Sequence, residues 1–215
     1  MNSAKDNTGS KDRDRLTTRG NPVEVARDDV LRKIGRNVVN FQKMEAMLKA
    51  LNAQQSITRS LGELQVLLAS ARKAVAKKTM GPLAEAFVNS VFSAAPKVRE
   101  PVDSREVAVS FSFRIEADQL IAEERKKALR AVVAERNKLV HRWLAGFDPH
   151  SKESCVQLSA KLDAQHASVM PEFEALRGIV AVFKELRAEM VRCVASDEFL
   201  TAISVGRASE SDVNR

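Results

Sequence analysis

Arg136, Asn137 and His141 are the residues whose types and spacing point most directly to chemistry in this sequence. They lie near the end of a long helical pattern, and a projection at about 100° per residue places Arg136 at the centre of its apolar stripe. A guanidinium cannot lose its proton to ease burial, so an arginine on such a face needs an anionic partner. The sequence leaves two partners open: the phosphate of a ligand, or a carboxylate such as Glu45, which interrupts the apolar face of an earlier helix.

His141 follows Asn137 by one helical turn but lies about 140° around the helix from Arg136. On a regular helix the arginine and the histidine therefore diverge, and one straight copy does not bring both to the same ligand. A local distortion of the helix, or a second copy of the chain across a two-fold axis, would bring them together. The alternative for His141 is an electrostatic role as a cation near a helix C-terminus.

Basic side chains surround this segment, and the formal net charge of the chain is +7. Such a charge favours an anionic partner, and a basic cleft attracts an RNA backbone. The alternative is a solvated helix face, where runs of charge are also common. The residues that we expect to contact RNA are Lys138, Arg142, Arg130 and Lys126.

The elements that must position these residues are helical. Apolar residues recur at steps of three or four over about 22–51, 60–78, 82–92, 116–144 and 152–194, which predicts helices there, the last one bent or broken near Pro171. Val107 to Ile115 alternates between apolar and polar residues and indicates a strand. No partner strand is evident, and the same segment of another subunit is one candidate. The predicted fold class is all-α, a bundle of four main helices plus short helices, with one short β excursion at 107–115.

Composition divides the chain into a tail, a domain and a second tail. Residues 1–20 hold almost no large apolar side chains and predict a disordered basic tail; 21–203 form a single helical domain, and 204–215 a polar C-terminal tail. His150 and His166 are expected at the surface. Cys155 and Cys193 lack CxxC spacing and nearby histidines, so we expect neither a disulfide framework nor a metal site, and no cofactor. No apolar run suits a signal peptide or a membrane span, which favours a cytoplasmic protein without membrane contact.

Arg136-Asn137 followed by His141, late in a bundle helix, resembles the motif of the HEPN (higher eukaryotes and prokaryotes nucleotide-binding) domains. In that family an arginine precedes a polar residue, often asparagine, and a histidine follows after a gap of four to six residues. The helix count over roughly 25–195 is similar to the all-α bundle of the family. Many members are metal-independent endoribonucleases of toxin–antitoxin, abortive-infection and other defence systems, and they act as dimers in which two motifs form one cleft.

The resemblance implies a role for each residue of the motif. His141 would exchange a proton with the ribose 2′-hydroxyl or the leaving oxygen, and Arg136 would bind the scissile phosphate. Asn137 would orient the histidine or the phosphate. The salt bridge to Glu45 considered above is compatible with these roles, because it would hold Arg136 in place. The implied partners are RNA, a second copy of the chain, and an antitoxin or defence protein.

A second hypothesis from another class stays open. The chain would then be a non-catalytic, dimeric helical protein that binds a nucleotide, a nucleic acid or a partner protein. Arg136 would serve structure or nucleotide binding in that case.

Overall fold

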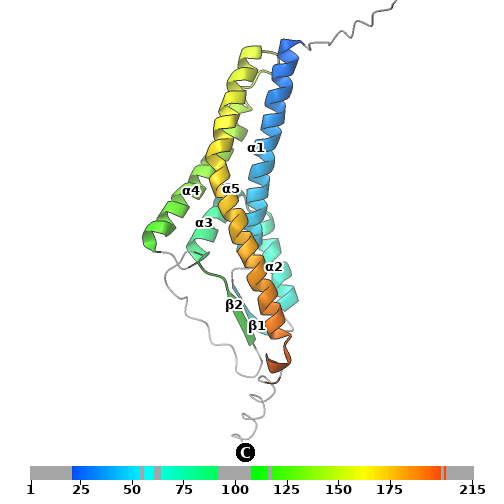
Figure 1. Ribbon diagram of the computed structural model, residues 1–215, viewed down its shortest axis with the longest axis vertical. Helices are drawn as coiled ribbons and strands as arrows, with labels where there is room; N and C mark the ends of the chain where they lie inside the picture. Colours follow the sequence, from blue (N-terminus) through cyan, green and yellow to red (C-terminus); the bar gives the residue numbers. More distant parts are fainter. Residues whose placement is uncertain are drawn as a thin grey trace, which may run out of the picture.

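The computed structural model describes residues 21–53, 56–60, 64–91, 108–115, 118–199 and 201, so the two predicted tails lie outside the described residues. The described chain is mostly helical, as predicted (Figure 1). Its elements, in chain order, are α1 (Pro22–Asn52), β1 (Ser56–Ser60), α2 (Leu64–Ala76), α3 (Met80–Val91), β2 (Ala108–Ser112), α4 (Gln119–Lys138), the π-helix η1 (Leu139–Trp143) and α5 (Lys152–Val194). None of these helices combines the length and the apolarity that crossing a bilayer requires.

The two longest helices begin at side-chain caps. The Oδ1 atom of Asn21 accepts a hydrogen bond from the backbone N–H of Val23 at 3.1 Å, and Pro22 occupies the first helical position, where no donor is lost. Ser151 caps α5 in the same way through the N–H of Ser154. α5 then continues through Pro171 as one helix, so the break considered from the sequence does not occur.

β1 and β2 form an antiparallel pair in which Ile57 lies opposite Phe111. The partner of the strand signal at 107–115 is therefore a segment of the same chain, and the pairing between subunits considered above is not needed. β1 was not predicted, because a five-residue segment with serine at both ends is too short to show a clear alternation of apolar and polar residues. The helix expected from residue 60 begins later, at Leu64.

The four main helices run in defined directions. Contacts between α1 and α5 join residues that are always 125 to 130 positions apart, so these two helices are parallel; they lie side by side along the molecule (Figure 1). α4 is antiparallel to α5, because Arg125 pairs with Glu172 and the later Glu135 with the earlier Gln165. The largest fully buried side chains come from α1, α3, η1 and α5, and they include Met44, Leu48, Phe87, Leu83, Leu139 and Leu162.

Two buried amides cross this core and connect three helices. Asn37 on α1 is 2% exposed and donates from Nδ2 to the carbonyl of Leu162 (2.9 Å) and to Oε1 of Gln165 (3.1 Å). Gln165 on α5 is 3% exposed and donates from Nε2 to the backbone carbonyl of Glu135 on α4 at 2.8 Å. Because an unpaired polar group is costly in a core, this chain of hydrogen bonds fixes how the three helices align.

His166 lies partly buried between α1 and α5, which corrects the expectation of a surface histidine. Its Nδ1 atom is 3.3 Å from Nδ2 of Asn40. Burial lowers the pKa of His166 below its ordinary value of 6.5, the positive charge of Arg36 lowers it further, and Asp163 opposes both effects.

Replacement of Asn37 by alanine should lower the free energy of unfolding by about 1–3 kcal/mol, because it removes the donor to the buried Oε1 atom of Gln165, whereas the carbonyl of Leu162 keeps Arg36 as a donor. Urea denaturation measures the change as a shift in midpoint at constant slope. Gln42→Ala, at an exposed position of the same helix, is the matched control and should change stability by less than about 0.5 kcal/mol. Equal effects of the two substitutions would contradict the role given to the buried amides.

Acidification should destabilise the fold through His166. The unfolded chain takes up a proton on this imidazole as the pH falls through about 6.5, whereas the folded protein keeps it neutral to lower pH. Stability is therefore complete above that pH and declines below it. Thermal melts between pH 7.5 and 5 should show a smaller decrease of Tm for His166→Gln than for the wild type; parallel curves would refute the assignment.

Candidate functional site

The helix that carries Arg136 and His141 changes its winding between them. α4 ends at Lys138, and the next turn is the π-helix η1, closed by a hydrogen bond of 3.1 Å from the N–H of Leu144 to the carbonyl of Leu139. A π turn holds more residues than an α turn, so the rotation per residue is smaller. The angle around the helix axis between Arg136 and His141 is therefore smaller than the 140° of a regular helix. The two side chains make no hydrogen bond with each other.

Packing on both sides of the junction holds this π turn. Leu139, its first residue, is fully buried. Trp143, its last residue, is partly buried and packs against the core. The N–H of Leu139 is shared between the carbonyls of Glu135 and Arg136, and the first of these also accepts the amide of Gln165. Single-turn π segments inside α-helices are frequent at functional sites.

Arg136 is half-buried, and its guanidinium has no carboxylate partner among the described residues. Its Nη1 atom donates to Oδ1 of the neighbouring Asn137 at 3.1 Å. Glu45 instead pairs with Lys49, one turn further along α1, with 2.8 Å between Oε1 and Nζ. The predicted bridge from Glu45 to Arg136 is therefore not formed, and Glu45 does not hold the arginine in place.

The start of α3 lies against α4 about one turn before Arg136. A Cβ atom on Gly81, the second residue of α3, would lie 3.7 Å from Cγ1 of Val133. Arg136 follows Val133 by about one turn. α3 begins only one residue before Gly81, so its contact with Val133 lies at its first turn, and a projection of α4 alone could not reveal this contact.

The other residues of the motif are exposed. Asn137 accepts the hydrogen bond from Arg136, so it orients the arginine rather than the histidine. His141 makes no hydrogen bond or ion pair with any residue that the structure describes. Lys138 pairs with Glu135 at 2.6 Å, and Arg142 stays unpaired within the described part of the chain. The segment thus presents an amide, an imidazole and two guanidinium groups to solvent.

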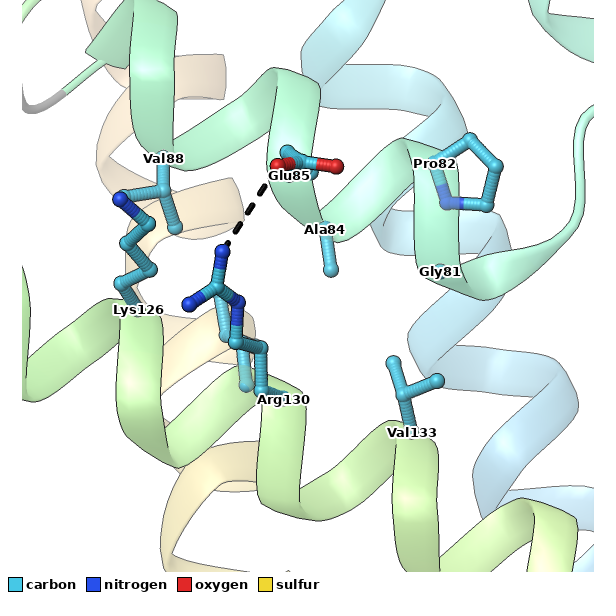
Figure 2. Close-up of a pocket in the computed structure, with 9 residues that line it drawn as sticks. Gly81, Pro82, Ala84, Glu85, Val88, Lys126, Arg130 and Val133 are labelled. Atoms are coloured by element: carbon cyan, nitrogen blue, oxygen red, sulfur yellow. Dashed lines mark ion pairs between the residues drawn. The ribbon is translucent and has the colours of Figure 1, made fainter.

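Lys126 and Arg130, two of the predicted RNA contacts, line a pocket of about 340 Å³ between α3 and α4 (Figure 2). Leu129 and Val133 complete the wall from α4. The wall from α3 is made by Gly81, Pro82, Ala84, Glu85 and Val88. Sequence reasoning placed the two cations on one helix but missed the pocket, because only the packing of α3 against α4 creates it.

Among the residues that the structure describes, no three histidine, cysteine or acidic side chains gather where they could hold a metal ion. Cys155 is buried and Cys193 is exposed, and both are free thiols. The groups available for chemistry at the motif are thus proton carriers and cations.

No protein-family model, curated protein or solved structure matches this chain. The likeness to HEPN domains therefore rests on the residues of the motif and on the helical architecture, and it stays a prediction.

Proposed function

We propose that this protein is a homodimeric, metal-independent endoribonuclease of the HEPN type, with a toxin or anti-phage defence role, whose site is built from Arg136, Asn137 and His141. The observation that carries the proposal is the guanidinium of Arg136, which is half-buried, oriented by Asn137 and paired with no carboxylate of the described chain. An arginine committed to a salt bridge would be neutralised. An arginine without one keeps its charge for a phosphate, and partial burial strengthens that contact.

The reaction needs a base, an acid and a cation. The ribose 2′-oxygen attacks the adjacent phosphorus, and the bond between phosphorus and the 5′-oxygen breaks. A base takes the proton of the 2′-hydroxyl, and an acid protonates the departing 5′-oxygen, which leaves a 2′,3′-cyclic phosphate and a 5′-hydroxyl. Imidazole can perform either proton transfer near neutral pH, and Arg136 stabilises the charge that develops on the phosphate.

One copy of the motif supplies one imidazole, whereas the reaction uses two proton carriers. In a two-fold dimer, His141 of the partner subunit would provide the second one, and each protomer would add its Arg136 to the shared cleft. The exposure of His141 and Asn137 leaves them free to meet such a partner. The nucleophile is the 2′-oxygen of the RNA itself, so the proposed reaction does not require a metal ion to generate it.

One observation favours the non-catalytic alternative. A catalytic histidine is commonly oriented by a third group, and His141 has no such partner among the described residues. In that alternative Arg136 still binds a phosphate, but no bond is broken. Cleavage assays separate the two possibilities.

The protein should cleave single-stranded RNA in excess EDTA and leave a 2′,3′-cyclic phosphate. His141→Ala should lower the rate by about 10²–10⁴-fold, because it removes a proton carrier from the transition state. Arg136→Ala should produce a comparable decrease through the loss of charge stabilisation. Gel analysis of end-labelled RNA gives the rates and the chemistry of the product ends.

His150→Ala is the matched control, because His150 is an exposed histidine of the loop that follows η1. It should cleave at the wild-type rate. If His141→Ala is as active as the wild type, the catalytic assignment is wrong. If the wild type binds RNA but never cuts it, the non-catalytic alternative replaces it.

The dimer requirement can be tested by mixing inactive variants. A heterodimer of Arg136→Ala and His141→Ala retains one intact residue of each kind, so a composite site should recover part of the wild-type activity. Co-expression with two affinity tags isolates the heterodimer, and light scattering verifies its mass. A heterodimer that is as inactive as either homodimer, or a monomeric wild type, would argue against a shared cleft.

A further inference from the structure

The pocket between α3 and α4 lies on the same face of α4 as Arg136. Lys126, Arg130 and Val133 recur at steps of three and four, and the next step reaches Arg136. At 1.5 Å of rise per residue, Val133 precedes Arg136 by about 4.5 Å along the helix axis and Arg130 by about 9 Å. An RNA strand that has one phosphate at Arg136, and whose next nucleotide lies along α4, would therefore pass over the pocket.

The walls of the pocket are apolar and come from two facing helices. Ala84 and Val88 on α3 are 4% and 6% exposed, and Leu129 on α4 is 2% exposed. In Figure 2 the side chain of Val133 points into the space below the first turn of α3. Gly81 and Val133 both line the pocket, and a Cβ built at Gly81 would meet Cγ1 of Val133 at 3.7 Å, an ordinary van der Waals contact, so the two helices are closely packed at this end of the pocket. A slot with apolar walls on two sides suits a flat ring.

Charged groups stand only at the mouth of the pocket. Arg130 and Glu85 face each other across it with 3.7 Å between Nη2 and Oε1, and their side chains are 65% and 62% exposed (Figure 2). So exposed a pair contributes little stability, and a ligand can replace it at small cost. Lys126 lines the same pocket, and its ammonium group lies 3.5 Å from Oε1 of the exposed Glu123, a pair that a ligand can also replace at small cost.

These groups match the parts of a nucleotide. Apolar walls accept the faces of a base, the two cations suit its phosphates, and a carboxylate accepts a hydrogen bond from an exocyclic amine such as N4 of cytosine. Uracil has a carbonyl at the corresponding place, which a carboxylate repels.

We propose that the pocket between α3 and α4 is a base-specificity subsite, which binds one base of the RNA strand beside the phosphate held at Arg136 and prefers cytosine to uracil. The inference rests on the proposed function, because the phosphate at Arg136 sets where the strand runs. Glu85 selects the base, Arg130 and Lys126 hold its phosphates, and Val133 forms the floor nearest the reacting centre.

Binding of strands that cannot be cleaved tests this subsite separately from catalysis. Fluorescence anisotropy is measured with 2′-O-methyl oligocytidine and oligouridine, because the methyl group blocks the nucleophile. The wild type should bind the cytidine strand about threefold to tenfold more tightly, as expected for one hydrogen bond. Glu85→Gln, an exposed substitution, should lose this preference, since its amide can serve either base.

Filling the pocket and removing its charge give two further readouts. Val133→Phe should weaken binding of the cytidine strand by about tenfold or more, because the ring occupies the slot. Arg130→Gln should lower the slope of log K against log salt concentration by about 0.7, the value for one phosphate contact on a single strand. Lys127→Gln is the matched control: it removes the same charge from an exposed position next to Lys126 that does not line the pocket, and should keep the cytidine preference.

Two results would overturn the subsite: a wild type without preference for cytidine, or a Glu85→Gln variant that retains the full preference. Thermal melts identify any variant that has lost its fold, and the exposed substitutions decide the question if Val133→Phe is such a case. RNA cleavage without a cytidine preference would leave the ribonuclease proposal standing and remove the subsite. A preference for cytidine without any cleavage would leave the subsite standing and remove the ribonuclease proposal.

Discussion

Two buried amide side chains, Asn37 and Gln165, connect α1, α5 and α4 at the level where the candidate site begins. The last link of this chain reaches the carbonyl of Glu135, one turn before the winding changes to a π-helix. Buried amides need hydrogen-bond partners, and the observed alignment of the three helices supplies them to both side chains. The positions of Arg136 and His141 relative to the rest of the bundle follow from that alignment.

The packing of α3 against α4 is the second constraint, and it creates the pocket. A pocket lies where α3 packs against α4, and the half-buried Arg136 follows about one turn after Val133, which contacts the start of α3. The two features are therefore neighbours on one face of α4.

Helix positions were largely predictable, and contacts between helices were not. The apolar period predicted α1 and α5 almost to the residue, because their burial repeats regularly over many turns and caps mark their starts. The partner of β2 was missed, as β1 is too short to carry a pattern. Glu45 was assigned to Arg136 because it lies on an apolar face, but it forms an ion pair with Lys49, one turn away on the same helix. His166 was expected in water because no single-helix pattern shows which turn of α1 lies against it.

The sequence by itself determined the helical class, the ends of the long helices and the segment in which an arginine, an asparagine and a histidine come together. These properties depend on local spacing, which every chain carries in its order of residues. Only the tertiary structure decided that the guanidinium of Arg136 is free of Glu45, that the helix unwinds at Leu139, and that a pocket opens beside Val133. Each of these depends on which side chain of a distant helix arrives at a given turn, and the spacing along one helix holds no information about that.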